Sequence, residues 1–481
     1  MSVLSENFDF LIKKYNLKIN QIAEECGIER SLLSKFKKGT RSLSPRSFKK
    51  MLGKLNIADS EKKTLTATYI DDYFGTDKYA EYLKILSKFS EHEPNQKDYS
   101  IKYKISAELD FKNNIMHLHS GENLLTAARY LIGIEIDREN GRIYSNIPSS
   151  SMLKLMQGFP NKIVDFKHIV SISSTGGYHF NMLSQIFELM SLGYISNYTS
   201  SPSGIYEQND LIYPFYIIFT DRVLLVDKEL KRGIICDNAD FAKHYADVFL
   251  NQFKYTDRYA YQCDNILSLK AMNEKLYSSE IESIYSFGTM NCQITTSLTL
   301  DMWEQIAKPD VPNREYLRDI TYAYYQKLEE CVKNMTLITS RKSLDDFISN
   351  GTVKTMPREY AYPLSKDNRI KLLQIIYDKY REENFDFYLF EDMPSFTMSD
   401  NLGIEVISNT KSPSQLNICY ETENSPMHYY GNIGLRTDNK FAVQDIANFL
   451  ECFIISSACH SKEDSLKILK EAIQKCQMIP E

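Results

Sequence analysis

The side chains best suited to contact a polyanion lie between residues 30 and 41 of this chain. Arginine, serine and lysine recur there at helical spacing, while Leu33 and Phe36 mark an opposite, apolar face. Arginine and serine can donate hydrogen bonds to base edges in a DNA groove, and basic side chains can neutralise phosphates. We therefore expect base contacts from Arg30, Ser31, Ser34 and Lys35, and phosphate contacts from Lys37, Lys38 and Arg41.

Two short helices joined at a glycine would present these side chains. Residues 19–26 and 30–38 carry apolar residues at helical spacing, and Gly27 between them suits a sharp turn. Ala23 is small enough for a second helix to cross closely, and Gly39 stands where a helix ends in a left-handed cap. A further helix is predicted to start at Ser44-Pro45, a hydroxyl cap followed by proline at the first helical position.

The stretch INQIAEECGIERSLLSKFKKGTR resembles the lambda-repressor-like (XRE) family of helix-turn-helix transcriptional regulators. The matching positions are Ala23, Gly27, Ile28, Ser31, Leu33, Ser34, Phe36 and Gly39. This resemblance implies a five-helix head whose second motif helix enters the major groove of DNA. The family usually has a hydroxyl cap and then a phosphate-bracing glutamine where this chain has Lys18 and Ile19, so we expect Lys18 to supply a substitute charge.

Charge is divided unequally along the chain. Residues 1–68 contain 14 lysines and arginines against 7 aspartates and glutamates, a balance of +7. Because the whole chain carries a net charge of −6, residues 69–481 carry −13. A basic head on an acidic body favours phosphate binding by the head alone, although a basic helix face can also be merely solvated.

Length and composition bound the other properties. A chain of 481 residues with 43% hydrophobic and 25% charged residues is expected to form two or three globular domains. It has no apolar run long enough to span a membrane and no apolar signal segment near its first residue. Nine cysteines without a CxxC pair favour a reducing compartment, so we expect a cytoplasmic protein without a membrane partner.

We predict a multidomain chain in which an all-α helix-turn-helix head precedes a mixed α/β (α+β) body. The predicted segments are a DNA-binding domain at 1–68, a helical connector and linker at 69–99, a mixed α/β sensor or oligomerisation module at 100–340, and a second mixed α/β module at 341–481. The polar run Ser90–Lys97 contains one proline and no large apolar residue, which suits a linker and a head that folds without the body.

Two segments of the body look alike. RGIICDNADFAKHYADVFLNQF and GNIGLRTDNKFAVQDIANFLECF each read as a strand, an Asp-Asn turn and a helix with paired aromatic residues. The similarity favours two related modules, although strand–turn–helix is also a common unit.

One turn of the body could hold a ligand. In SSTGGYH, Ser173–His179, a glycine-containing turn leads from a strand into a helix, whose N-terminal N–H groups suit an anion. The candidate ligand-binding residues are Ser174, Thr175, Gly176, Gly177 and His179. The turn lacks the GK[ST] ending of a P-loop and the GxGxxG of a dinucleotide fold, so an ordinary strand-to-helix turn explains it more simply.

Other reactive side chains are scattered. His117 and His119 share one side of a strand, and Cys452, Cys459 and His460 share a helix face, but neither group has the further ligands that a metal needs. The second group is better explained as two buried cysteines of a core helix than as a metal site. No nucleophile-elbow, kinase or zinc-protease motif occurs, so we predict no catalytic residue, no metal and no cofactor.

These patterns predict a sequence-specific regulator of transcription that is not an enzyme and binds double-stranded DNA as a homodimer. Its body would sense a small molecule or a peptide, or assemble the oligomer. Two alternatives stay open: a mobile-element or phage-defence component, and an enzyme of unrecognised fold fused to a DNA-binding head. The operator, the effector and the sign of regulation, activator or repressor, are not readable from the sequence.

Overall fold

The protein combines an α-helical N-terminal part with two mixed sheets, so it has a mixed α/β architecture of several parts. The computed structural model describes residues 2–75, 77–91, 113–159, 164–171, 179–192, 194, 196–199, 212–258, 261–262, 281–288, 297–310, 314–316, 318–319, 322, 326, 333–353, 361–382, 384–391, 402–409, 414–421 and 432–478. The chain forms two compact units. Unit 1 comprises Met1–His92, Cys263–Gly434 and Ala442–Glu481, and unit 2 comprises Glu93–Gln262 and Leu435–Phe441.

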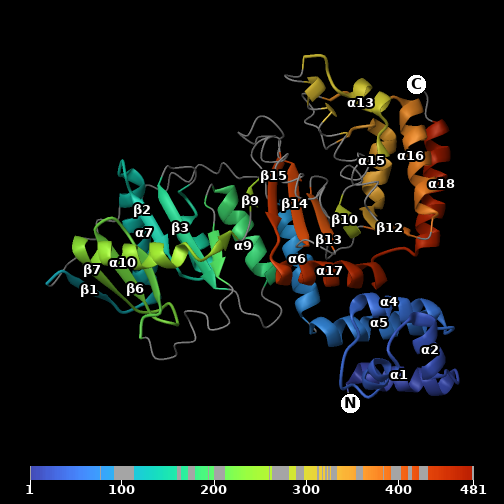
Figure 1. The fold of residues 1–481 in the computed structure, drawn as a ribbon, viewed down its shortest axis with the longest axis horizontal. Helices are drawn as coiled ribbons and strands as arrows, with labels where there is room; N and C mark the ends of the chain where they lie inside the picture. Colours follow the sequence, from blue (N-terminus) through green and yellow to red (C-terminus); the bar gives the residue numbers. More distant parts are fainter. Residues whose placement is uncertain are drawn as a thin grey trace. The chain divides into compact units, whose positions relative to one another are not determined.

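The N-terminal part of unit 1, here called the head, is a bundle of short helices (Figure 1). Its helices are α1 (Val3–Lys14), α2 (Ile19–Cys26), α3 (Arg30–Lys37), α4 (Pro45–Lys54), α5 (Asp59–Phe74) and α6 (Lys78–Glu91). Phe36 of α3 meets the rings of Phe8 and Phe48 edge to face, and Phe48 stacks on Tyr69 of α5 with ring centroids 3.7 Å apart. These aromatic contacts fix α3 against the rest of the head.

The expected caps of the head are present. Ser44 accepts a hydrogen bond from the Ser47 amide, and Pro45 is the first residue of α4. Gly27 ends α2 in the left-handed conformation, with φ of 60°, and the Ile28 amide then donates to the Ala23 carbonyl at 2.9 Å. Only glycine adopts this conformation without strain, so Gly27 determines the abrupt turn between α2 and α3.

Unit 2 is built on the sheet that we call sheet A. Among the described residues its strand order is β1-β7-β6-β5-β2-β3-β4-β8. The strands are β1 (Ile115–Leu118), β2 (Arg142–Ser145), β3 (Asp165–Ser171), β4 (Ser196–Thr199), β5 (Phe215–Ile218), β6 (Arg222–Val226), β7 (Gly233–Asp237) and β8 (Asp257–Arg258). Helices α7 (Gly121–Asp137), α8 (Ser149–Met156) and α9 (His179–Ser191) share one apolar core with the sheet, and α10 (Ala239–Phe253) shares a second.

The other sheet, sheet B, has the order β12-β11-β10-β13-β14-β15-β9 among the described residues. Its strands are β9 (Tyr261–Gln262), β10 (Ile281–Gly288), β11 (Asn334–Ser340), β12 (Phe385–Phe390), β13 (Leu402–Asn409), β14 (Gln415–Glu421) and β15 (Asn432–Thr437). The helices are α13 (Leu300–Ile306), α15 (Arg341–Asn350), α16 (Lys366–Tyr380), α17 (Lys440–Ile455) and α18 (Lys462–Met478).

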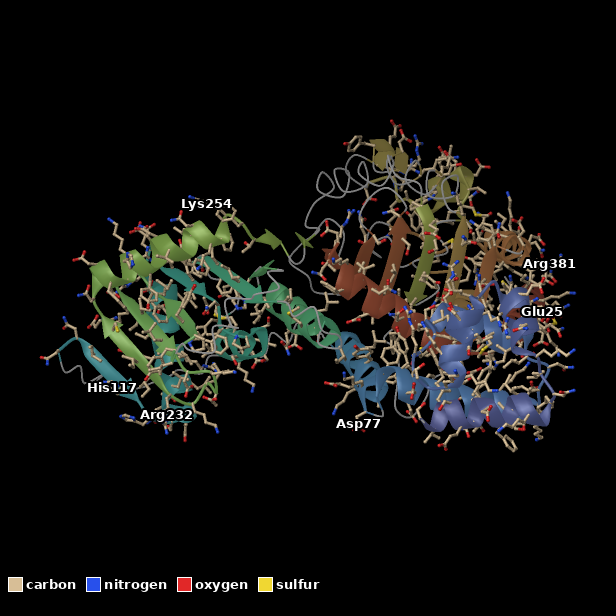
Figure 2. The ribbon with its side chains drawn as sticks, turned by 60° about the horizontal axis from the view of Figure 1, so that its bottom comes forward. Glu25, Asp77, His117, Arg232, Lys254 and Arg381 are labelled. Atoms are coloured by element: carbon tan, nitrogen blue, oxygen red, sulfur yellow. The ribbon has the colours of Figure 1, made fainter. Side chains whose placement is uncertain are left out.

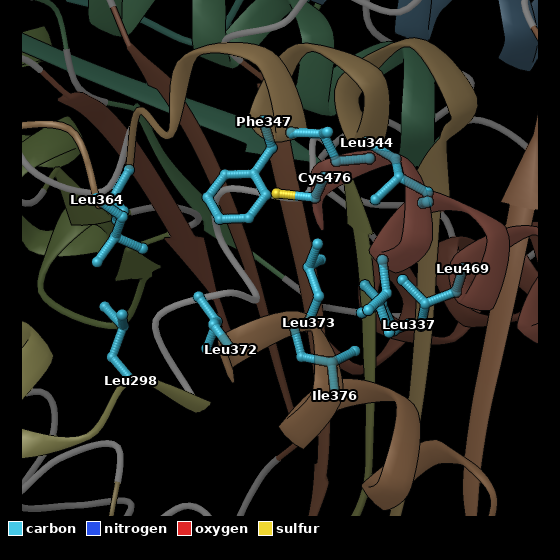
Figure 3. Close-up of a cluster of buried hydrophobic side chains, with 14 of the residues drawn as sticks. Leu298, Leu337, Leu344, Phe347, Leu364, Leu372, Leu373, Ile376, Leu469 and Cys476 are labelled. Atoms are coloured by element: carbon cyan, nitrogen blue, oxygen red, sulfur yellow. The ribbon is translucent and has the colours of Figure 1, made fainter. Parts of the chain in front are cut away.

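One face of sheet B carries a large apolar core. Leu337 of β11 meets Phe347 of α15, Leu373 of α16 and Cys476 of α18 in this cluster (Figure 3). All four side chains are at most 2% exposed. Burial of aliphatic and aromatic side chains at this density is the main stabilising contribution of the region.

The two sheets repeat one connection pattern. In sheet A the order β7-β6-β5-β2-β3-β4 corresponds strand for strand, and in the same chain sequence, to β15-β14-β13-β10-β11-β12 in sheet B. Strands β2, β3 and β4 run parallel, as do β10, β11 and β12, while β5 and β13 pair antiparallel to β2 and β10. The last strand of each set leads through an asparagine into a helix, α10 or α17, and the asparagine side chain accepts a hydrogen bond from the first turn of that helix.

The segment boundaries expected from the sequence do not match the division of the strands between the two sheets. Strands β10 and β11 precede residue 341 yet belong to sheet B, so the expected boundary at 340 falls directly after β11. Of the predicted linker Ser90–Lys97, Ser90 and Glu91 end α6, and residues 92–97 lie outside the described residues. Parallel strands that are far apart in the chain form one sheet, which a linear division cannot represent.

The head also shares its core with α17. Cys452 of α17 is fully buried in the apolar cluster of the head, with Ile455 packed beside it. Tyr79 and Tyr82 of α6 contact the ring of Phe449 on the same helix at centroid distances of 5.5 and 5.8 Å. The head therefore contacts the rest of unit 1 through packed side chains as well as through the chain, and its predicted folding without the body stays a prediction.

In the described part of the chain, no helix combines the length and the apolar character needed to cross a bilayer.

Substitutions at Gly27 and Gly53 can separate the effect of backbone conformation on stability from the effect of packing. A Cβ at either position would have no atom within 4 Å, but only Gly27 has a positive φ, and Gly53 lies inside α4. Gly27→Ala should therefore lower the free energy of unfolding by about 1 kcal/mol, because alanine is strained in that conformation. Gly53→Ala should raise it by about 0.5 kcal/mol, because alanine favours a helix. Calorimetric midpoints of the full chain test this, and shifts of equal sign would contradict it.

Asp445 of α17 should make stability depend on pH. Burial raises the pKa of its carboxyl to about 6, against a weaker lowering by Lys78, and its Oδ2 has no hydrogen-bond partner. The folded state therefore binds more protons than the unfolded chain between about pH 4 and pH 6, and stability should fall as pH rises through this window.

Asp445→Asn should remove this fall of stability with rising pH, and should raise the free energy of unfolding by up to about 3 kcal/mol at neutral pH. Denaturant unfolding at successive pH values measures it. Asp438→Asn, at an exposed position shortly before α17, is the matched control and should keep the fall. A wild-type protein whose stability is the same below and above the window would refute the assignment.

Candidate nucleic-acid interface

The basic residues expected from the sequence lie on and beside α3. Leu33 and Phe36 point into the head core and are at most 2% exposed. Of the predicted contact residues, Lys18, Arg30, Ser31, Lys35, Lys38 and Arg41 are exposed, and Ser34 and Lys37 are half-buried. Figure 2 shows charged side chains over the outer faces of the head helices. The α3 helix thus buries one side and presents cationic and hydroxyl groups on another.

Two of these side chains are already engaged within the head. Lys37 pairs with Asp9 of α1 at 3.0 Å, and Asp9 also pairs with Lys13 at 2.7 Å. Hydrogen bonds from Lys13 and Lys37 hold the pKa of the Asp9 carboxyl below its usual value. Ser31 donates a hydrogen bond to the Glu29 carboxylate. Lys37 and Ser31 are therefore less available to a ligand than their spacing in the sequence indicates.

Four cations keep their charge unpaired. Within the described part of the chain, Arg30, Lys35, Lys38 and Arg41 take part in no ion pair. They follow one another along α3 and the loop after it. Unpaired, exposed cations at this spacing can bind the phosphates or the base edges of a polyanion.

The ends of the two motif helices lack side-chain caps. Neither Lys18 before α2 nor Glu29 before α3 makes a side-chain cap hydrogen bond. The Glu29 carboxylate is turned to Ser31 instead. The N-terminal amide groups of both helices are therefore not capped by these side chains, and a phosphate can accept hydrogen bonds from such groups.

A second basic row was missed in the sequence. Arg46, Lys50 and Lys54 of α4 are spaced four residues apart, which places them on one helix face, and all three are exposed. They lie at the rim of a cavity of about 490 Å³ between α4 and sheet B. The i, i+4, i+8 spacing could have identified this row, but the cavity depends on strands far away in the chain.

The reactive groups of the body form no recognisable centre among the described residues. Residues Ser174, Thr175, Gly176 and Gly177 lie outside the described part, and only the backbone of His179, at the start of α9, is described. His117 lies exposed on β1, the end strand of sheet A among the described residues (Figure 2). His119 follows β1 and is also exposed, with its ring centroid 6.1 Å from that of His117. No group of three histidine, cysteine or carboxylate side chains that could hold a metal is found in the described residues.

Cys452 and Cys459 lie in different environments. Cys452 is buried in the head core. Helix α17 ends at Ile455, so the prediction that Cys459 and His460 share a helix face with Cys452 is wrong, and Cys459 instead pairs through its backbone with Phe390 of β12. Burial raises the pKa of both thiols. Protonated, buried thiols are poor nucleophiles and poor metal ligands.

No protein-family model and no curated protein matches this chain. Phosphatidylserine synthase from Haemophilus influenzae Rd KW20 is 10% identical with a TM-score of 0.24, over 76% of this chain and 94% of that chain. TrmBL2, an archaeal chromatin protein described as having a novel mode of DNA binding, is 11% identical with a TM-score of 0.22, over 53% of this chain and 99% of that chain. TM-scores this low support no conclusion about fold or function.

Proposed function

We propose that this protein is a sequence-specific DNA-binding regulator of transcription whose head is a helix-turn-helix domain of the lambda-repressor-like type. The observation that carries the proposal is the basic side of α3, where Arg30 and Lys35 form no ion pair with any described residue. Leu33 and Phe36 anchor this helix in the core, and the left-handed Gly27 sets it at an angle to α2. In this reading α3 is the recognition helix, and its first residues reach base edges in the major groove.

The contacts divide into two kinds. Arg30, Ser31, Ser34 and Lys35 contact bases, whereas Lys18, Lys37, Lys38 and Arg41 contact mainly phosphate. The pairing of Lys37 with Asp9 reduces its share of the phosphate energy, because the ammonium must leave one carboxylate before it binds another. Arg30 is the residue on which we expect sequence discrimination to depend most, since a bidentate arginine–guanine contact is worth about 1–3 kcal/mol.

The body is proposed to consist of two related modules that sense an effector or assemble the oligomer. The matching order and direction of the strands in sheets A and B, each leading through an asparagine cap into α10 or α17, support a common origin. The packing of α17 into the head core provides a direct physical connection from the second module to the DNA-binding helices.

Two substitutions on α3 should have different consequences. Arg30→Ala should flatten the sequence preference, because its contact discriminates between bases. Lys38→Ala should weaken binding to all DNA about equally and reduce the slope of log affinity against log salt by about 0.9. Selection from a random DNA library and salt titration measure the two effects. Lys63→Ala on α5, an exposed lysine away from α3, is the control. An unchanged motif and an unchanged slope in both variants would exclude this orientation of α3.

A homodimer is expected on a roughly palindromic site. One recognition helix contacts too few base pairs for selective binding, and a two-fold pair doubles the contacts, with half-sites ~34 Å apart or a multiple of that. Light scattering with and without operator DNA gives the stoichiometry. A monomer at micromolar concentration that binds DNA one to one would count against the dimer.

A further inference from the structure

The strands β10, β11 and β12 carry polar side chains on the face opposite their apolar core. Tyr285, Thr336 and Asp386 are register partners across the three strands. Ser283 and Asn334 form a second row beside them. The alternate residues, such as Leu337 and Phe387, enter the apolar core. Further along the same face, Phe287 and Phe390 pack against Phe453 of α17, so the polar side chains are confined to the start of the strands. Packing alone would favour apolar side chains there as well.

Helix α4 lies beside this polar part of the sheet, which Lys49 contacts at Asp386 and Tyr388, and a cavity separates the two elements. The cavity of about 490 Å³ is lined from the sheet by Ser283, Tyr285, Thr336 and Asp386, and from α17 by Glu451. Its other wall consists of Glu25 and Cys26 at the end of α2 and of α4, which contributes the basic row Arg46, Lys50 and Lys54 together with Lys49 and Gly53. The volume falls within the range of small-molecule sites.

The floor of the cavity contains a carboxylate oxygen without a hydrogen bond. Glu451 is 5% exposed, and its Oε1 accepts a hydrogen bond from the Tyr285 hydroxyl. Its Oε2 lies 3.6 Å from Lys49 Nζ, too far for a hydrogen bond, and accepts none. A buried charged acceptor in this state is costly unless a donor reaches it.

Lys49 only partly compensates the acidic floor. Its ammonium lies 3.7 Å from Asp386 and 4.7 Å from the ring centroid of Tyr388. Burial would lower the pKa of Lys49, but Glu451, Tyr388 and Asp386 together raise it. Asp386 is shared with Lys462 at 3.1 Å. One protonated lysine is thus divided between two carboxylates, while three cations at the rim have no ion pair among the described residues.

We propose that this cavity binds a small zwitterion of the amino acid class. Its ammonium group would donate to Glu451 Oε2 at the floor, and its carboxylate would lie among Arg46, Lys50 and Lys54 at the rim. Three cations against the one carboxylate of Glu25 leave the rim positive, and the floor holds the carboxylates of Glu451 and Asp386. These opposite charges fix the orientation of the ligand, and both of its charged ends are matched.

The position of the cavity gives the ligand a route to the recognition helix. Lys50 of α4 accepts a hydrogen bond from Cys26 of α2 through its carbonyl, and Phe48 of α4 contacts Phe36 of α3. A ligand that alters the distance of α4 from sheet B would therefore alter the setting of α2 and α3. This coupling rests on the proposed DNA-binding function, whereas the binding of the ligand does not.

Titration calorimetry of the full chain without DNA tests the site. The probes are the individual proteinogenic amino acids and, for each, the amine lacking the carboxylate and the acid lacking the ammonium. We expect saturable binding of at least one amino acid and about tenfold or greater weakening for both truncated probes. Absence of saturable binding for every amino acid, or equal affinity of a truncated probe, would overturn the proposal.

Substitutions of cavity residues test whether the amino acid binds in this cavity. Glu451→Gln and Arg46→Ala should each weaken it about tenfold or more. Glu471→Gln, an exposed position on α18, should leave it unchanged. If Glu451→Gln does not fold, Arg46→Ala and Lys54→Ala decide, because both side chains are exposed, and an unchanged affinity in both would overturn the site.

DNA binding measured with and without the amino acid that binds separates the two proposals. A change in operator affinity of severalfold or more supports the coupling, and an unchanged affinity overturns the coupling alone. A protein that binds the amino acid but no DNA would refute the proposed function and leave the site intact.

Discussion

Helix α17 lies between two apolar surfaces, and the architecture of unit 1 depends on its burial on both sides. Phe453 packs against Phe287 and Phe390 of sheet B, while Cys452 enters the core of the head. Phe449 meets the tyrosines of α6. Removing so much apolar surface from water holds the sheet, the helix and the head in one compact unit. The head is therefore connected to the second module through packing as well as through the chain.

Burial on both sides has an electrostatic consequence. A helix that packs on two sides places some of its polar residues in the interior, and here Asp445 and Glu451 each have a buried oxygen that accepts no hydrogen bond. Lys49 and Tyr285 compensate Glu451 in part, and Lys78 acts weakly on Asp445. Such groups cost stability, because a buried charge loses its hydration. Both lie on the helix that packs between the head and sheet B.

The two sheets show how one pattern can be used in two ways. Helices α10 and α17 occupy equivalent places after β7 and β15, yet α10 leaves Lys243 and Asp247 exposed to solvent, whereas α17 is buried along most of its length. The sequences reflect this difference: KHYAD at the centre of α10 is amphipathic, whereas ANFLECFII at the end of α17 is apolar except for Asn448 and Glu451. A second apolar face on α17 is what allowed the head to pack there.

The sequence alone determined the features that depend on neighbouring residues: the glycine turn at Gly27, the Ser44-Pro45 cap, the basic side of α3, and the resemblance of the segments that became β7–α10 and β15–α17. Each is set by backbone preference or by local periodicity, which a few residues carry. Only the tertiary structure decided that β10 and β11 join sheet B, that Asp9 engages Lys37, and that α4 closes a polar cavity over three strands. These features need contacts between residues far apart in the chain, and no local pattern of residue types specifies which distant surfaces will pair.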